Sequence, residues 1–170
     1  WIPRPLRKMI SRIFEKFENY AVEKFDGVVA ATPVIRERFV GLNANVVNVC
    51  NFPITSEFVS GVPWESRNNE ICYIGSLSRN RGIESLISSL VDAKTRLNLA
   101  GSWSDDGLKQ SISSNPGWAF VNELGSLDRS GVSSVLSRSK VGIVTLFPTK
   151  NYVDSLPIKL FEYMAAGIPV

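Results

Sequence analysis

The stretch Ser155 to Val170, S-L-P-I-K-L-F-E-Y-M-A-A-G-I-P-V, carries the most information about this chain. Pro157 suits the first turn of a helix, where its missing N–H costs nothing. Gly167 suits the position just past the end of a helix. The sequence therefore predicts a short helix over residues 157–166. The apolar run V-G-I-V-T-L at 141–146 predicts a strand that leads into it.

The start of this helix is a candidate phosphate site, because the first N–H groups of a helix are free and carry the positive end of its dipole. These groups belong to Ile158 and Lys159. Glu162 lies about one turn further on, and its carboxylate could accept a hydrogen bond from a sugar hydroxyl. Alternatively, the helix is simply buried and Glu162 pairs with Lys159.

Beyond residue 25 the chain alternates short, mostly β-branched apolar runs with helical stretches. This alternation predicts an α/β fold, a Rossmann-like parallel sheet with helices on both faces. The expected strands are 27–31, 46–50, 71–75, 97–100, 118–121 and 141–146. The expected helices after residue 25 are 33–40, 83–93, 105–114, 129–138 and 157–166.

The segment 51–70 is rich in Pro, Ser and Asn, which predicts a linker. Residues 1–50 would then hold an amphipathic helix and the end of a first domain, and residues 71–170 a second domain. The chain starts at Trp1 rather than Met and stops at Val170, directly after a helix. We therefore expect a fragment whose second domain is truncated.

The composition, 44% hydrophobic and 21% charged, is that of a globular domain, and no apolar run approaches the ~20 residues of a membrane span. Histidine is absent, which removes the commonest general base and metal ligand. Cys50 and Cys72 lie in strand-like contexts and are expected to be buried thiols in a reducing cytoplasm. No Asp-x-Asp pair of the kind that holds Mg²⁺ occurs. We therefore expect a reaction that needs no metal or other cofactor.

Residues 1–25 place apolar side chains at three- and four-residue steps, which predicts an amphipathic helix. They hold six basic and three acidic residues, so their formal charge of +3 equals that of the whole chain. The helix could pack against the domain with a solvated basic face, or it could meet an anionic membrane surface. No nucleic acid partner is expected, because the rest of the chain is neutral and lacks a known binding module.

A second motif, Y-I-G-S-L-S-R-N-R-G, runs from Tyr73 to Gly82 between a predicted strand and a predicted helix. Gly75 would let the backbone approach a ligand closely. Arg79 and Arg81 bring fixed positive charge to the carboxyl end of a strand, where ligands of open α/β sheets bind. The same arrangement is also common in turns without any binding role.

The closing helix resembles the signature of the retaining glycosyltransferases of family 4, nucleotide-sugar-dependent enzymes with two facing Rossmann-like domains (the GT-B architecture). In that family a helix of the form P-x-K-x-F-E-Y-M-A-x-G-x-P-V carries the second acid of a Glu-x7-Glu pair. Glu162 matches this acid, which implies that it holds the ribose of the donor. Asp154 stands in place of the first acid, one methylene shorter, which implies a catalytic position near the donor sugar.

The motif at 73–82 resembles the family segment strand-G-R-L-x-x-x-K-G, whose basic residues hold the donor diphosphate. Arg81 matches the Lys of that segment. Ser76 replaces its Arg, and Arg79 could supply the missing contact.

The run V-N-E-L-G-S-L at 121–127 resembles the family's strand and loop whose backbone meets the nucleobase. This likeness implies that Glu123 and Leu124 contact the base of the donor. The resemblance covers nearly all of residues 26–170.

The resemblance implies a retaining hexosyltransferase that uses UDP-sugar in preference to GDP-sugar, with an N-acetylhexosamine such as GalNAc. The acceptor would be a polyprenyl-diphosphate-linked saccharide of O-antigen or capsule biosynthesis, at the inner face of the cytoplasmic membrane. This piece alone would be inactive. Two alternatives are a GT-B-type nucleotide-sugar epimerase, whose acid and base would lie outside the piece, and a non-catalytic nucleotide-binding module.

Overall fold

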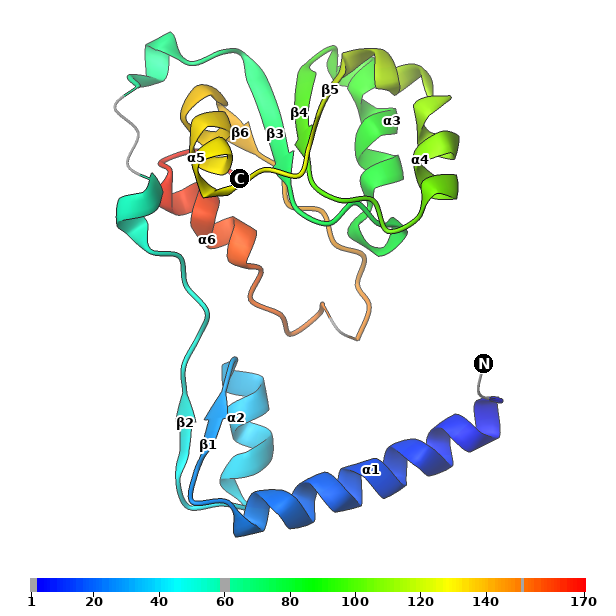
Figure 1. Cartoon of the computed structure of the whole chain (residues 1–170), viewed down its shortest axis with the longest axis vertical. Helices are drawn as coiled ribbons and strands as arrows, with labels where there is room; N and C mark the ends of the chain where they lie inside the picture. Colours follow the sequence, from blue (N-terminus) through cyan, green and yellow to red (C-terminus); the bar gives the residue numbers. More distant parts are fainter. Residues whose placement is uncertain (1–2, 59–61, 151) are drawn as a thin grey trace. The chain divides into compact units, whose positions relative to one another are not determined.

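The computed structural model describes residues 3–58, 62–150 and 152–170 (Figure 1). It divides into two compact units, the first ending at Asn51 and the second beginning at Phe52. No helix among the described residues is both long and apolar enough to cross a membrane.

Unit 1 consists of α1 (Arg4–Lys24), β1 (Val28–Ala30), α2 (Pro33–Val40) and β2 (Val46–Asn48). The two strands pair in parallel, with Val28 opposite Val46. Thr32 begins α2, because its hydroxyl accepts the N–H of Ile35 at 3.3 Å. Val22, Phe39 and Val46 form the small core of this unit.

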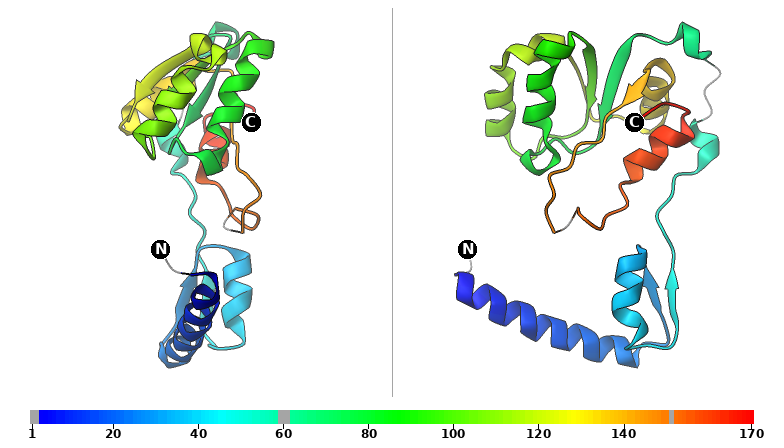
Figure 2. Two further views of the ribbon diagram at one scale, coloured as in Figure 1. Left: turned by 90° about the vertical axis from the view of Figure 1, so that its right-hand side faces the viewer. Right: turned by 180° about the vertical axis from the view of Figure 1, so that it is seen from behind.

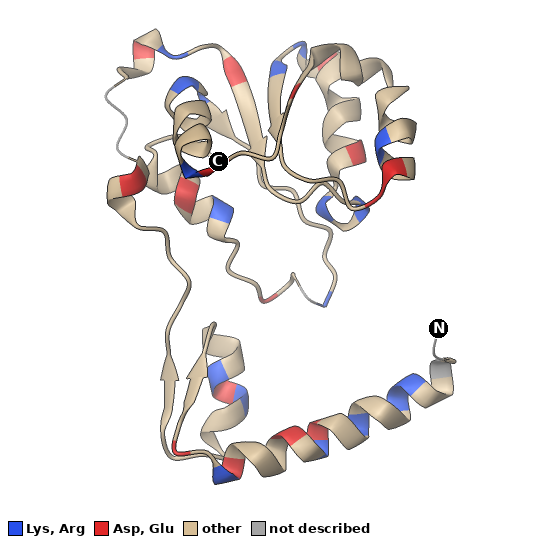
Figure 3. Ribbon diagram, viewed as in Figure 1, with Lys and Arg blue, Asp and Glu red and all other residues tan. Residues whose placement is uncertain are grey.

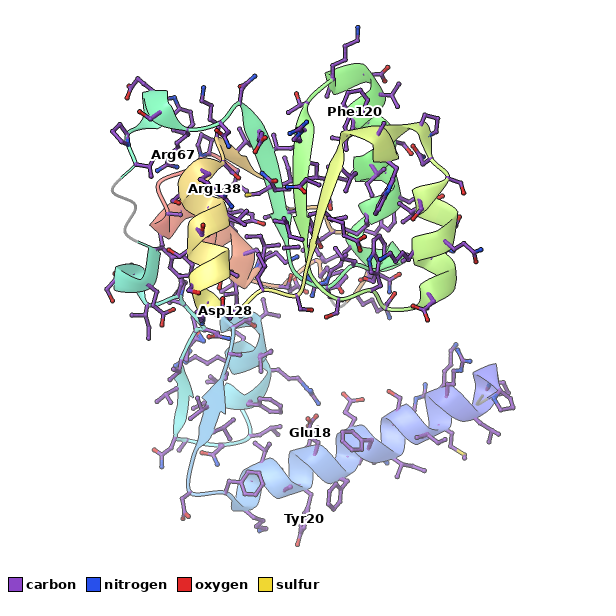
Figure 4. The ribbon with its side chains drawn as sticks, turned by 45° about the horizontal axis from the view of Figure 1, so that its top comes forward. Glu18, Tyr20, Arg67, Phe120, Asp128 and Arg138 are labelled. Carbon is purple, nitrogen blue, oxygen red and sulfur yellow. The ribbon has the colours of Figure 1, made fainter. Side chains whose placement is uncertain are left out.

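Apolar side chains of unit 1 are exposed along α1 and along both strands. The exposed large hydrophobic residues of α1 are Leu6, Met9, Ile10, Ile13, Phe14, Phe17 and Tyr20. Figure 4 labels Tyr20, together with Glu18, which pairs with Arg38. Val29 and Val47 are also exposed. Parallel sheets are normally covered on both faces. In unit 1, by contrast, the described residues leave apolar faces uncovered.

Unit 2 is built on a four-stranded parallel sheet in the order β5-β4-β3-β6. The strands are β3 (Glu70–Ile74), β4 (Arg96–Ala100), β5 (Val121–Gly125) and β6 (Val141–Gly142). The helices are α3 (Ile83–Ala93), α4 (Asp106–Ser113), α5 (Arg129–Arg138) and α6 (Ile158–Ala165). Figure 2 shows α3 and α4 on one side of the sheet and α5 and α6 on the other. The predicted α/β fold with a parallel sheet and helices on both faces is thus confirmed.

Neighbouring residues of β3 point to opposite faces of the sheet and enter two separate cores. Tyr73 packs with Ile83 and Leu99 in the core under α3 and α4. Cys72 packs with Leu136 in the core under α5 and α6. Burial raises the pKa of the Cys72 thiol to about 11, so this cysteine is the buried thiol that was expected.

The other cysteine differs from the expectation. Cys50 is only half-buried, because it lies two residues beyond the last residue of β2, near the end of unit 1.

The prediction of a strand at 118–121 is wrong. Pro116–Phe120 form a 3₁₀ helix, η4, and β5 starts one residue later at Val121. Asn115 begins this helix by accepting the N–H of Gly117 at 2.8 Å. The apolar residues of this segment pack against the core beneath α3, so their apolar character reflects burial rather than strand pairing.

The strand expected at 141–146 pairs with β3 only at Val141 and Gly142. Ile143 still donates its N–H to the Cys72 carbonyl at 2.8 Å, and the chain then leaves the sheet.

The expected linker, 51–70, contains two 3₁₀ helices, η1 (Thr55–Phe58) and η2 (Trp64–Ser66). Phe58 is buried in the core under α5 and α6. The ring of Phe52 meets Phe161 of α6 edge-on, with centroids 4.8 Å apart. These contacts attach the segment to unit 2.

Candidate functional site

A cleft of about 430 Å³ lies beside the turn that follows β3 and the start of α6. Its lining comes from the turn, from the segment that follows β6 and from the first residues of α6. It includes Gly75, Ser76, Arg81, Tyr152, Pro157, Ile158 and Lys159. The two motifs that the sequence singled out therefore share one cleft at the carboxyl edge of the sheet, where ligands of open α/β sheets bind.

Both the backbone conformation at position 75 and a neighbouring side chain require glycine there. Its φ is 140°, a value that residues other than glycine rarely adopt. A Cβ at this position would collide with Cε and Nζ of Lys159. The chain from β3 can therefore run directly beneath the lysine of α6.

Arg81 ends a short 3₁₀ helix, η3 (Arg79–Arg81), in the turn after β3. The hydroxyl of Thr145 donates to the Arg81 carbonyl at 2.6 Å and so holds the backbone of the turn. The guanidinium lies 5.7 Å from the ring centroid of Tyr152. No carboxylate of the described residues forms an ion pair with Arg81.

Lys159 directs its amine into the same cleft. Its Nζ lies 3.9 Å from the ring centroid of Tyr73, a cation–π contact. Burial lowers the pKa of Lys159 to about 7; the charge of Arg81 also lowers it and that of Glu162 opposes the shift. Within the described part of the chain no carboxylate forms an ion pair with Lys159 either.

The first two N–H groups of α6 are free for a ligand. No backbone hydrogen bond among the described residues uses the N–H of Ile158 or Lys159, as expected for a first helical turn. No side chain caps this end of α6.

Glu162 lies one turn beyond Lys159 but pairs with a different residue from the one considered above. Its Oε1 is 3.2 Å from Nη1 of Arg129, the first residue of α5. The same guanidinium lies 3.5 Å from Glu57 of η1. Asp128, labelled in Figure 4, places Arg129 by accepting the N–H of Gly131 at 2.8 Å as the cap of α5. The alternative in which Glu162 pairs with Lys159 is therefore wrong.

Glu162 is not part of the cleft lining, and two other predicted residues also lie outside it. Arg79 is exposed, and its Nη1 lies 3.4 Å from Glu84. Asp154 is exposed in the segment between β6 and α6.

Glu123 and Leu124 of β5 also lie away from this cleft. The carboxylate of Glu123 accepts the indole N–H of Trp103 at 2.7 Å and pairs with Lys109 at 2.8 Å. Leu124 packs against the core under α5 and α6. A smaller hollow of about 280 Å³ lies at the ends of β3, β4 and β5, lined by Ser76, Ser102 and Ser126 among others.

Sequence reasoning missed three residues that shape the site. Tyr73 supplies the ring beneath the lysine, and Tyr152 lies beside Arg81. Arg129 holds the carboxylate of Glu162. Tyr152 stands three residues before Ser155, close enough to the closing motif to have been considered, whereas a single Arg at a helix start gives no local signal.

No group of three or more His, Cys, Asp or Glu side chains within 3–58, 62–150 and 152–170 could hold a metal ion. Figure 3 marks Lys and Arg positions in the turn after β3 and on α6 in unit 2, and along the first half of α1 in unit 1.

The fold and the cleft define the class as an α/β domain with a cleft at the carboxyl edge of a parallel sheet. Residues 56–170 match the family described as Glycosyl transferases group 1, and the chain belongs to this family. A comparison with curated protein sequences gave no match.

Solved structures of the GT-B type share this fold. AviGT4, a glycosyltransferase involved in avilamycin A biosynthesis, is 14% identical with a TM-score of 0.67, over 84% of this chain and 42% of its own. The G117R mutant of S. aureus TarM, solved with UDP, fondaparinux and α-GlcNAc-glycerol, is 18% identical with a TM-score of 0.64, over 91% of this chain and 32% of its own. WaaG, a glycosyltransferase involved in lipopolysaccharide biosynthesis, is 12% identical with a TM-score of 0.56, over 84% of this chain and 42% of its own. The chain thus spans less than half the length of each.

Proposed function

We propose that unit 2 binds the nucleotide diphosphate sugar donor of a retaining hexosyltransferase. The observation that carries this proposal is the convergence of Arg81 and Lys159 on one cleft, with no acid of the described residues paired to either. Two basic side chains without an acidic partner favour an anionic ligand. Membership of the glycosyltransferase group 1 family makes a sugar nucleotide the best candidate.

Arg81, Lys159 and the N–H of Ile158 would hold the diphosphate. When the glycosidic bond breaks, negative charge develops on the leaving diphosphate. Fixed positive groups and oriented N–H groups stabilise that charge most in the transition state. Because these groups can neutralise the leaving group, we propose a reaction that needs no metal.

Glu162 would bind the ribose hydroxyls, with Arg129 holding its carboxylate in place. Asp154 would contact the donor sugar, and the backbone of Glu123 and Leu124 would meet the base. Asp154 lies on an exposed segment, so its role would require that segment to approach the ligand.

For the donor we propose a UDP-N-acetylhexosamine such as UDP-GalNAc. The UDP present in the TarM structure supports the nucleotide. For the acceptor we propose a polyprenyl-diphosphate-linked saccharide of surface polysaccharide biosynthesis. The role of WaaG in lipopolysaccharide biosynthesis supports this class of acceptor.

We also propose that α1 contacts the anionic inner face of the cytoplasmic membrane. Its exposed apolar residues and the basic residues of its first half, Lys8 and Arg12 among them, support this role. Amphipathic helices of this kind lie in the membrane interface.

Calorimetric titration of UDP and UDP-GalNAc into the chain tests the donor site. We expect binding that Arg81→Ala weakens about tenfold or more, since a charged hydrogen bond contributes about 1.5–3 kcal/mol. Arg79→Ala is the matched control, because Arg79 belongs to the same turn but points to Glu84. Absence of binding at millimolar ligand would overturn the proposal.

A further inference from the structure

We propose that the side chain of Lys159 is a titratable ligand of the diphosphate, which binds the donor with uptake of one proton by its amine. This inference rests on the proposed function of the cleft and adds to it a regulation of donor binding by pH. It concerns the side chain of Lys159, whereas the sequence pointed to the backbone N–H of the same residue.

The position of the Lys159 amine indicates a group that binds an anionic ligand rather than one that forms a structural ion pair. The side chain runs over Gly75, which has no Cβ to obstruct it, and its Nζ faces the ring of Tyr73 at 3.9 Å. Tyr73 is fully buried in β3. The ring is a neutral surface, because burial raises the pKa of Tyr73 to about 12. The amine therefore rests on a π face and has its remaining hydrogen-bonding capacity toward the cleft.

The charged groups around the amine disfavour its protonated form. Arg81 lies across the cleft and carries a permanent positive charge. Glu162, on the same helix, is the nearest source of opposing charge, but its carboxylate is paired with Arg129 at 3.2 Å. Tyr152 lines the cleft beside Arg81. Burial and this cation together keep the pKa of Lys159 near 7.

A diphosphate in the cleft would reverse this balance. Its oxygens would lie between the guanidinium of Arg81 and the amine of Lys159, and the negative charge would favour the ammonium form. A proton then passes from the solvent to the lone pair of Nζ, and no other bond forms or breaks. When the nucleoside diphosphate leaves after transfer, the same proton returns to the solvent. Donor affinity should consequently fall as the pH rises above 7.

Proton uptake can be measured by titrating UDP into the chain at pH 8 in two buffers of different ionisation enthalpy, Tris and HEPES. The terminal phosphate of UDP is already ionised at this pH, so it does not contribute. A lysine of pKa about 7 is mostly neutral at pH 8, and we expect an uptake of about 0.8 proton per UDP bound. Lys159→Met should abolish the uptake and weaken binding about tenfold or more. The matched variant Lys94→Met, at the exposed end of α3, should change neither.

The outcomes separate this inference from the proposed function. Binding of UDP without buffer-dependent heat, or uptake that persists in Lys159→Met, would overturn the inference and leave the donor site standing. Failure of the unmodified chain to bind UDP would overturn both. A second measurement needs no variant: after ¹³C-dimethylation of the lysines, one amine resonance should titrate near pH 7 and shift above pH 9 with UDP. If no lysine behaves in this way, the inference is wrong.

Discussion

The hydroxyl of Tyr163 accepts the backbone N–H of Ile74 at 3.1 Å and so joins α6 to the last residue of β3. Tyr163 is buried, and its ring lies against Gly142, where any Cβ would collide with it. Gly75 follows Ile74 directly, and Lys159 lies one turn before Tyr163 on the helix. This hydrogen bond therefore links the two walls of the cleft.

Replacing Tyr163 by Phe removes the acceptor and leaves a partly buried N–H unsatisfied. We expect the free energy of unfolding to fall by about 1–3 kcal/mol. Urea unfolding followed by circular dichroism measures it. Tyr20→Phe, at an exposed position of α1, is the control and should have no effect. Equal stability of Tyr163→Phe and the parent chain would show that this bond does not hold α6.

Gly75→Ala should weaken UDP binding about tenfold or more, because a Cβ displaces the amine of Lys159 and φ is 140°. Calorimetry measures the affinity. Gly41→Ala is a suitable control, because a Cβ there meets nothing within 4 Å. Unchanged affinity in Gly75→Ala would argue against the lysine as a ligand.

Two acids share the guanidinium of Arg129, and only one of them is expected to contact the donor. Glu162→Ala should lower UDP affinity by about 2 kcal/mol, roughly thirtyfold, through loss of a charged hydrogen bond to the ribose. Glu57→Ala removes the other partner of Arg129 and should leave affinity nearly unchanged. If the two variants lose affinity equally, Glu162 acts through Arg129 rather than on the donor.

Lys159 should also make the stability of the unliganded chain depend on pH. Its pKa is about 7 in the folded chain and 10.5 as an unperturbed group. Between these values the unfolded chain binds more protons, so the free energy of unfolding rises with pH. We expect the stability of the parent chain relative to Lys159→Met to increase from pH 7 to pH 10. Thermal unfolding at both pH values measures this, and a constant difference would contradict the lowered pKa.

The membrane proposal for α1 predicts charge-dependent binding to vesicles. The double variant Lys8→Glu/Arg12→Glu should reverse the attraction and reduce sedimentation with anionic vesicles, with little change on neutral ones. The double variant Lys94→Glu/Lys150→Glu makes the same change of charge in unit 2 and is the control. Equal binding of the parent chain to neutral and anionic vesicles would remove the proposal.

Local signals predicted the regular elements of unit 2 well. The helices expected at 83–93 and 129–138 are α3 and α5 with the same bounds. The helical period of apolar residues and the residues that begin or end a helix depend only on near neighbours in the sequence, so both can be recognised from the sequence alone. The prediction of a strand at 118–121 was wrong because a short apolar segment is compatible with either a strand or a buried 3₁₀ turn.

The sequence by itself determined the α/β order, the closing helix between Pro157 and Gly167 and the two motifs with their charges. Only the tertiary structure decided which groups meet. It placed Lys159 on the ring of Tyr73, joined Glu162 to Arg129 and turned Arg79 toward Glu84. Caps and periods are local, whereas these contacts, apart from that of Arg79, join residues tens of positions apart whose separation is set by how the helices pack on the sheet.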